Sequence, residues 1–386
     1  MRQAGKFKEL VKGAALAAVL FAATAVSAET LRYAHGNPPA APSVKAAERY
    51  KALVEQYSGG TLKVRVYPNS LLANQEISSG LQDGLADIGL LLTSYHPSEY
   101  PNFSMVADLS MLATSSDKGW KVGLYAFVGA LMDYVFFDCP KCHAEFAAHN
   151  QVYLGGFSST AYGLACTKPV TTLADIKGMS IRAVGASWAR WTEFVGGNPV
   201  TMPGSEMLQA LAQGVVGCVE TNLVDLVNWG LYEVTSDFTT DVPGGAFAQV
   251  AGMQVNAQVW KRLTPQQRTA LMRGAAAQAA GTLALYIEQE EAALARIASE
   301  GRMKMHKPAA DLRERTDEFI VQDRETIVEY YEKNFGVTGG AQEVEKLVGK
   351  FGTWLGLMDG VETRQDAEAI YWEHLYSKLD PASYGL

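Results

Sequence analysis

The chain has 386 residues, with 33 basic and 41 acidic side chains and a formal net charge of −8 at pH 7. An acidic chain has no general attraction for nucleic acid or for an anionic lipid surface, so neither class of partner is expected. This length exceeds what one compact core usually holds, and we expect two domains.

Residues 1–28 have the pattern of a secretory signal peptide. A basic start is followed by the apolar run "AALAAVLFAATAV", and small residues at Val26 and Ala28 precede Glu29. The apolar run is too short to span a bilayer comfortably. We therefore expect a soluble, exported, periplasmic protein, with an uncleaved anchor as the alternative. Removing this segment leaves 29 basic and 40 acidic side chains, so an anionic ligand would need a locally placed positive group.

Strand and helix patterns alternate through the first half of the chain. Residues 43–57 and 74–85 place apolar side chains at helical spacing, and a longer helix is predicted over 117–136. Extended patterns precede, separate and follow the first two helices in "ETLRYAH", "TLKVRVYP" and "ADIGLLL". This order predicts a parallel sheet with helices on its faces.

The second region repeats the same order. Helices are predicted near residues 188–194 and 204–213. Strands are predicted in "QVYLGGF", "YGLACT", "MSIRAVG", "NPVTMP", "VGCVETN" and "QVAGMQVNAQVW". Two α/β lobes without a flexible linker indicate that the chain crosses between them more than once. We expect lobe 1 to hold residues 29–157 and about 248–290, and lobe 2 to hold residues 158–247 and about 291–386.

A long helical pattern begins at Thr264, which is a suitable N-cap, and continues to residue 301. Roughly 35 helical residues is long for a globular protein. We expect a kink, or a helix that lies across both domains. Two further helices are predicted over about 308–335 and 341–378. These late helices could form a homodimer interface or an interlobe spine, so monomer and homodimer both stay open.

Arg182, in "DIKGMSIRAVG", is the candidate ligand-binding cation. It lies near the carboxyl end of a short strand, and the carboxyl ends of strands in open α/β sheets form the ligand crevice. An arginine there can hold a carboxylate by two parallel hydrogen bonds. The alternative is a surface arginine in a salt bridge.

Three stretches resemble one family: "VYPNSLLANQEISSGLQDGLADIGLL", "KPVTTLADIKGMSIRAVG" and "PVTMPGSEMLQALAQGVVGCVETN". The chain is similar to the solute-binding subunit of tripartite ATP-independent periplasmic (TRAP) transporters, of the dicarboxylate-binding type. The resemblance implies an α/β, two-lobed periplasmic binding protein, type II-like, with parallel or mixed sheets, an interlobe cleft and a long C-terminal helix. It also implies hinge closure around a small organic acid and delivery to small and large membrane permease subunits. No enzyme activity, cofactor or metal is implied.

The resemblance assigns Arg182 the main salt bridge to the ligand carboxylate, helped by an asparagine on a later strand. The family's Gln-Glu-Asn reads here as Val219-Glu220-Thr221. Thr221 or the following Asn222 therefore takes the asparagine's place, and Glu220 is a candidate ligand contact as well. Some members carry a second arginine where this chain has Tyr162. Without that second cation, the pocket is not expected to hold a ligand with a carboxylate at each end. Tyrosine offers an aromatic face and one hydroxyl instead. We therefore expect a monocarboxylate, with an aromatic or otherwise flat apolar body.

Three further residues are candidate ligand contacts. Trp188 and Tyr95 could supply walls of the cleft, and His35 follows the first strand, where the mouth of the crevice is expected. Each has a plainer interpretation. Tryptophan and tyrosine at such positions commonly pack a core or an interlobe surface, and a single histidine after a strand is commonly a hydrogen-bonded structural residue.

The stretch "FFDCPKCHAEF" contains Cys139, Cys142 and His143 in the C-x-x-C-H pattern of c-type haem attachment. A zinc site that adds His149 has workable spacing too. In an oxidising compartment we expect these two cysteines to form a small-loop disulfide instead. A periplasmic haem or metal-binding redox protein is accordingly the alternative function.

Cys166 and Cys218 lie on two predicted strands of the second lobe. If these strands are neighbours, the two cysteines can form a second disulfide. The sequence contains no G-x-S-x-G, G-x-x-x-x-G-K-[ST] or H-E-x-x-H motif and no strand-following G-x-G-x-x-G. A lyase or hydrolase on a binding-protein scaffold stays possible, since a fold alone does not determine function.

Overall fold

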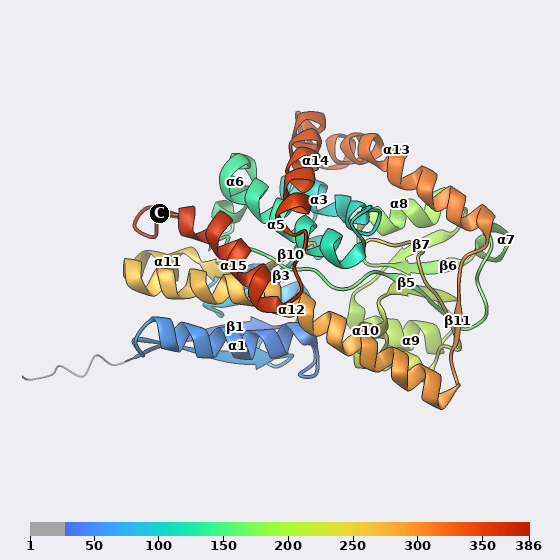
Figure 1. The fold of residues 1–386 in the computed structure, drawn as a ribbon, viewed down its shortest axis with the longest axis horizontal. Helices are drawn as coiled ribbons and strands as arrows, with labels where there is room; N and C mark the ends of the chain where they lie inside the picture. The colour runs from blue at the N-terminus through green and yellow to red at the C-terminus, as the bar shows by residue number, and fades with distance from the viewer. Residues whose placement is uncertain (1–27) are drawn as a thin grey trace, which may run out of the picture.

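The computed structural model describes residues 28–386 and contains two β-sheets surrounded by helices (Figure 1). The predicted signal peptide, up to residue 27, lies outside the described residues. In Figure 1 the first lobe lies to the left, around α1 and β1, and the second to the right, around β5 and β6.

The sheet of lobe 1 has the strand order β2-β1-β3-β10-β4. Strand β1 pairs in parallel with β2 and β3, as the strand–helix–strand order predicted, whereas β10 is antiparallel to both of its neighbours. The strands are β1 (Glu29–His35), β2 (Leu62–Pro68), β3 (Ile88–Leu92), β4 (Gln151–Val152) and β10 (Val250–Asn256). The helices that precede β4 are α1 (Pro42–Tyr57), α2 (Ile77–Gln82), α3 (Pro101–Ala107), α4 (Met111–Thr114), α5 (Trp120–Asp138) and α6 (Pro140–Ala148).

The sheet of lobe 2 has the order β11-β9-β5-β8-β6-β7 and is mixed, because β5 runs antiparallel to β8 and β9. Its strands are β5 (Gly163–Cys166), β6 (Ser180–Ala183), β7 (Asn198–Thr201), β8 (Cys218–Thr221), β9 (Asp237–Thr239) and β11 (Lys304–His306). Its helices are α7 (Leu173–Ile176), α8 (Ala186–Phe194), α9 (Met207–Ala212) and α10 (Leu223–Asn228).

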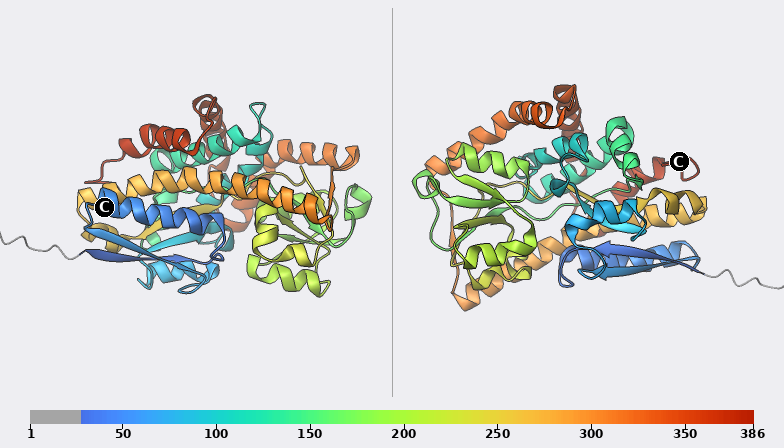
Figure 2. Two further views of the ribbon diagram at one scale, coloured as in Figure 1. Left: turned by 60° about the horizontal axis from the view of Figure 1, so that its bottom comes forward. Right: turned by 180° about the vertical axis from the view of Figure 1, so that it is seen from behind.

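The chain crosses between the lobes several times, as expected. It passes from β4 to β5, returns from β9 to β10, and then enters α12 (Pro265–Glu300). Thr264 caps this helix, since its side chain accepts a hydrogen bond from the backbone N–H of Gln267. Helix α12 packs against α1 of lobe 1 and against α10 of lobe 2 (Figure 2). The long helix therefore lies across both lobes.

Two predicted elements end differently in the structure. The stretch "QVAGMQVNAQVW" was expected to be a strand throughout, but β10 stops at Asn256, whose side chain accepts hydrogen bonds from the backbone of Gln258 and Val259. This cap starts α11 (Ala257–Arg262). "QVYLGGF" was likewise expected to be a full strand, whereas only Gln151–Val152 pair.

The C-terminal helices α13 (Ala310–Phe335), α14 (Gly340–Leu357) and α15 (Arg364–His374) require a correction. We assigned residues 291–386 to lobe 2, and α13 does pack against α8 there, but α14 packs against α5 and α15 against α12. The predicted helix over 341–378 is divided in two, because α14 ends at Leu357 and Thr363 caps a new helix, with Gly360 at a φ of 80° in the turn between them. The C-terminal region therefore rests partly on helices of lobe 1.

Helix α5 is apolar and long enough to cross a membrane by composition alone, but 72% of its most apolar window is buried. Trp354 of α14 covers this helix and donates a hydrogen bond to Asp133 Oδ2 at 2.9 Å. Tyr371 of α15 donates to the carbonyl of Tyr125 at 2.7 Å. Helix α5 is therefore a core helix of the folded chain.

All four cysteines form disulfides, in the pairs Cys139–Cys142 and Cys166–Cys218. The second pair joins directly opposed residues of β5 and β8, so the predicted strands are neighbours. The first pair overturns the haem and metal alternatives. With both sulfurs bonded to each other, neither thiol is free to form a thioether to a haem or to ligate an ion.

Candidate ligand-binding cleft

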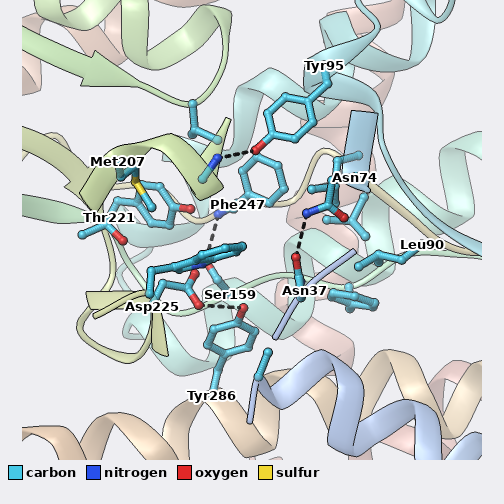
Figure 3. Close-up of a pocket in the computed structure, with 18 of the residues that line it drawn as sticks. Asn37, Asn74, Leu90, Tyr95, Ser159, Met207, Thr221, Asp225, Phe247 and Tyr286 are labelled. Carbon is cyan, nitrogen blue, oxygen red and sulfur yellow. Dashed lines mark hydrogen bonds between the residues drawn. The ribbon is translucent and has the colours of Figure 1, made fainter. Parts of the chain in front are cut away.

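A cavity of about 650 Å³, counting space that is open to solvent, lies between the two lobes (Figure 3). Lobe 1 contributes polar groups from the segments that follow β1 and β2, together with Tyr95 and the apolar ends of β3. Lobe 2 contributes residues from the ends of β6 and β8, and α12 contributes Tyr286. The strand ends of both sheets thus meet at one cavity, as expected for a crevice in α/β sheets.

Arg182, on β6, lies at the wall of this cavity with only 2% of its surface exposed. Its Nε donates to the carbonyl of Met202 at 3.1 Å, and its Nη1 donates to the carbonyl of Glu220 at 3.2 Å. Within residues 28–386, no carboxylate lies within salt-bridge distance of Arg182, and no hydrogen bond engages its Nη2. The backbone therefore orients a buried guanidinium that lacks a counter-ion.

The Glu220 side chain forms no ion pair with this cation within the described residues. The side chain is completely buried, and its Oε1 accepts a hydrogen bond from Thr192 Oγ1 at 2.7 Å while Oε2 has no partner within the described residues. Burial raises the pKa of Glu220 well above its usual value. The hydrogen bond from Thr192 and the charge of Arg182 lower this pKa by less than burial raises it. Burial therefore disfavours the charged form of Glu220, whose side chain lies outside the cavity lining.

Asp225, on α10, lines the cavity and was missed by the sequence analysis. Its Oδ2 accepts a hydrogen bond from Asn222 Nδ2 at 2.8 Å, and its Oδ1 accepts from the Tyr286 hydroxyl at 3.4 Å. Burial raises the pKa of Asp225 to about 6, against the smaller opposing effects of Asn222, Tyr286 and Arg182. Figure 3 shows Asp225 and Tyr286 directed toward each other at one side of the cavity.

Stacked aromatic rings form another wall. Tyr162 stacks on Trp188 with ring centroids 4.9 Å apart, and Phe247 lies 6.5 Å from Tyr162. Tyr162 and Phe247 line the cavity, whereas Trp188 is fully buried behind them and donates its indole N–H to the carbonyl of Gly244 at 3.2 Å. The cavity thus offers flat apolar surface beside the guanidinium.

Residues 33–330 match the family described as bacterial extracellular solute-binding protein, family 7, DctP. The chain belongs to this family. It is 24% identical over 342 residues to the C4-dicarboxylate-binding periplasmic protein DctP of Rhodobacter capsulatus. This alignment covers 83% of this chain and 92% of the Rhodobacter protein.

Solved structures share the fold. A marine metagenome TRAP solute-binding protein specific for aromatic acid ligands, in complex with metahydroxyphenylacetate, has a TM-score of 0.72 and 19% identity. DctP6, a Bordetella pertussis extracytoplasmic solute receptor binding pyroglutamic acid, has a TM-score of 0.68 and 20% identity. Each comparison covers 84% of this chain and 99% of the other. These findings confirm the predicted TRAP-type family and fold, and the family is one of extracytoplasmic transport proteins rather than enzymes.

The residues predicted from the sequence divide into two groups in the structure. Four of them line the cavity together, namely Arg182, Tyr162, Thr221 and Tyr95. The other four lie outside its lining, namely Glu220, Asn222, Trp188 and His35.

Asn222 and His35 have structural partners. Asn222 caps α10, since its Oδ1 accepts from the backbone N–H of Asp225 at 2.8 Å. His35 is fully buried, and its Nδ1 accepts from the backbone N–H of Asn37 at 3.4 Å. Burial lowers the pKa of His35 to about 3, so the ring is neutral.

Four further residues of the lining were not predicted from the sequence, namely Asn37, Asn74, Phe247 and Tyr286. Asn74 Nδ2 donates to Asn37 Oδ1 at 2.9 Å, on the opposite side of the cavity from Asp225 in Figure 3. Asn37 follows β1 at its carboxyl end, so its strand-end position in lobe 1 was a usable signal, like that of Arg182 in lobe 2. Phe247 and Tyr286 gave no such signal, since they come from a connection and from the middle of a long helix.

Proposed function

We propose that this chain is the exported solute-binding subunit of a TRAP transporter that captures an organic acid with one carboxylate and an aromatic or otherwise flat body. The observation that carries the proposal is the buried, backbone-oriented Arg182 without a counter-ion at the cavity wall. A ligand carboxylate that reaches the free edge of the guanidinium forms charge-assisted hydrogen bonds away from water. This gives an acidic protein its selectivity for an anion.

The preference for one carboxylate rests on the charges of the lining. Among the described residues, Arg182 is the only lysine or arginine that lines the cavity, and Asp225 adds a carboxylate. A dianion would therefore bring a second charge that has no cation to meet it. The aromatic faces of Tyr162 and Phe247 favour a flat apolar body. The ligands of the two solved relatives, metahydroxyphenylacetate and pyroglutamic acid, each carry one carboxylate, whereas the Rhodobacter relative is named for C4-dicarboxylates.

Transport would follow from lobe closure. Residues 1–28 would direct export to the periplasm and be removed there. A ligand that contacts both lobes stabilises the closed state by its difference in affinity for the closed and open states. The closed, loaded protein would then dock to the small and large membrane subunits.

A thermal-shift screen of the mature protein against organic acids tests the proposal. The panel contains aromatic monocarboxylates, aliphatic monocarboxylates and C4-dicarboxylates, each with wild type and Arg182→Ala. A ligand that binds only the folded state raises the melting temperature. We expect aromatic monocarboxylates to raise the melting temperature of the wild type but not that of Arg182→Ala, where each protein is compared with its own ligand-free melting temperature. A larger rise with dicarboxylates would overturn the monocarboxylate assignment, and no rise with any acid would overturn the function.

A further inference from the structure

The carboxylate of Asp225 has unused hydrogen-bonding capacity inside the cleft. A carboxylate offers about four acceptor positions on its two oxygens. Within the described residues, its only donors are Asn222 Nδ2 at 2.8 Å and the Tyr286 hydroxyl at 3.4 Å. The second distance exceeds the usual range for an O–H···O bond. Oδ1, on the side of Tyr286, is therefore weakly satisfied.

No cation compensates Asp225 directly. Within residues 28–386 no lysine, arginine or histidine lies within salt-bridge distance of it, and Arg182 acts on it only through space. Its immediate partners, Asn222 and Tyr286, are both neutral donors. Burial disfavours the charged form of such a group, which is consistent with its raised pKa. A ligand anion that fills the cleft removes further water from Asp225 and adds a like charge nearby.

A hydrogen-bond donor on the ligand would offset the loss of water from the Asp225 carboxylate and the repulsion from the ligand anion. A hydroxyl or amide N–H directed at Oδ1 replaces the displaced water and stabilises the carboxylate, whereas an apolar group in the same place leaves it unsatisfied. The cleft then has two polar poles, with the cation of Arg182 for the ligand carboxylate and the anion of Asp225 for a donor. Both residues line the same cavity: Arg182 lies near the end of β6, and Asp225 lies on α10, which follows β8.

We infer that Asp225 is a specificity-determining residue that selects acids carrying a hydroxyl or amide N–H donor over otherwise identical acids without one. This inference rests on the proposed function and narrows its substrate class to hydroxy or lactam monocarboxylic acids. The plainer role of Asp225 is structural, because its backbone N–H and its side chain both bond to the cap residue Asn222. A structural role predicts equal effects of mutation on both kinds of acid.

Calorimetric titration with matched pairs of acids tests the inference. The two acids of each pair differ by one donor: phenylacetate with mandelate, phenylacetate with 3-hydroxyphenylacetate, propanoate with lactate, and 3-oxocyclopentanecarboxylate with pyroglutamate. In wild type we expect the donor-bearing acid of at least one pair to bind about 10- to 100-fold more tightly, the range for a hydrogen bond to a charged group. Asp225→Asn, which keeps the side-chain shape and one acceptor oxygen, should reduce that ratio to within about threefold of unity.

Two comparisons separate this result from its alternatives. Asp83→Asn makes the same chemical change at an exposed position and should leave the ratio unchanged. Tyr286→Phe removes the weak competing donor and should preserve or increase the ratio. A ratio near unity in every wild-type pair, or an unchanged ratio in Asp225→Asn, overturns the inference while the proposed function stands. Failure of every acid to bind wild type overturns both.

Discussion

The phenol oxygen of Tyr95, in lobe 1, accepts a hydrogen bond from the backbone N–H of Gly204, in lobe 2, at 3.1 Å. Tyr95 ends the short 3₁₀ turn Thr93–Tyr95 that follows β3, and Gly204 begins the turn Gly204–Glu206 that follows β7. Both residues line the cavity, so this bond closes one side of the cleft (Figure 3). If the lobes open and close as proposed, this bond exists only in the closed form and stabilises that form specifically.

Tyr95→Phe should weaken ligand binding without unfolding the protein. The substitution removes one interlobe hydrogen bond and keeps the ring, so the loss is about 0.5–1.5 kcal/mol, or roughly 2- to 13-fold in affinity. Calorimetry of the ligand found in the screen measures this loss, and the melting temperature without ligand checks the fold. Unchanged affinity would show that the bond plays no part in closure.

The disulfide Cys166–Cys218 should contribute far more stability than Cys139–Cys142. It joins residues 52 apart, against 3 for the other pair. Chain-entropy estimates give about 4 kcal/mol for the longer loop and about 1.5 kcal/mol for the shorter one. All four sulfurs are buried, so paired Cys→Ala variants make matched packing changes. Urea unfolding of the two double variants should separate them by about 2 kcal/mol, and equal losses would contradict this account.

Gly129 and Gly349 test the packing of α14 on α5. A Cβ at Gly129 would overlap the indole of Trp354, whereas a Cβ at Gly349 has nothing within 4 Å. Gly129→Ala should therefore destabilise the protein by about 1–3 kcal/mol, as overpacking does. Gly349→Ala should stabilise it slightly, by about 0.5–1 kcal/mol, through helix propensity. If Gly129→Ala is neutral in urea unfolding, α14 does not pack against α5 as described.

Ionisation of Asp225 should make stability fall as the pH rises. Its pKa is about 6 in the folded protein and near 3.9 in an unfolded chain, so the folded state binds more protons between these values. Stability is then lost between about pH 4 and 6, and Asp225→Asn removes that loss. At pH 7.5 without ligand, the variant should be on the order of 1–2 kcal/mol more stable than wild type, because the side chain keeps some contact with solvent.

Urea unfolding at pH 4 and pH 7.5 measures this dependence. The difference between Asp225→Asn and wild type should shrink toward zero at pH 4, where both side chains are neutral in the folded protein and little of the stability loss has yet occurred. Asp83→Asn again serves as the exposed control. A variant that is less stable than wild type at pH 7.5 would show that the ionised carboxylate stabilises the fold instead.

Periodicity predicted most helices and strands because each carries its own pattern of apolar residues. It failed where an end is decided by one side chain or by tertiary contacts. Asn256 ends β10 by capping α11, and Thr363 starts α15 after the turn that contains Gly360. The position of α14 on α5 could not be predicted, because the apolar pattern of an amphipathic helix shows which face is buried but not which surface it packs against.

The candidate site shows the same division. Strand-end position and family resemblance identified Arg182 and Thr221, which line the cavity. Asp225 was missed because its position depends on the cap at Asn222, which gives α10 its starting point. Tyr286 was missed because only the course of α12 across both lobes brings it to the cleft. Contacts between residues this far apart in sequence follow from the fold and not from local pattern.

The salt bridge proposed for Arg182 can be measured directly by calorimetric titration of the best acid from the screen. Arg182→Ala should weaken binding at least 100-fold, since it leaves the ligand carboxylate desolvated and unpaired. Arg182→Lys should recover part of that affinity, because lysine keeps the charge but not the planar pair of donors. Arg324→Ala, an exposed change on α13, should leave affinity unchanged. Wild-type affinity in a folded Arg182→Ala variant would contradict the account.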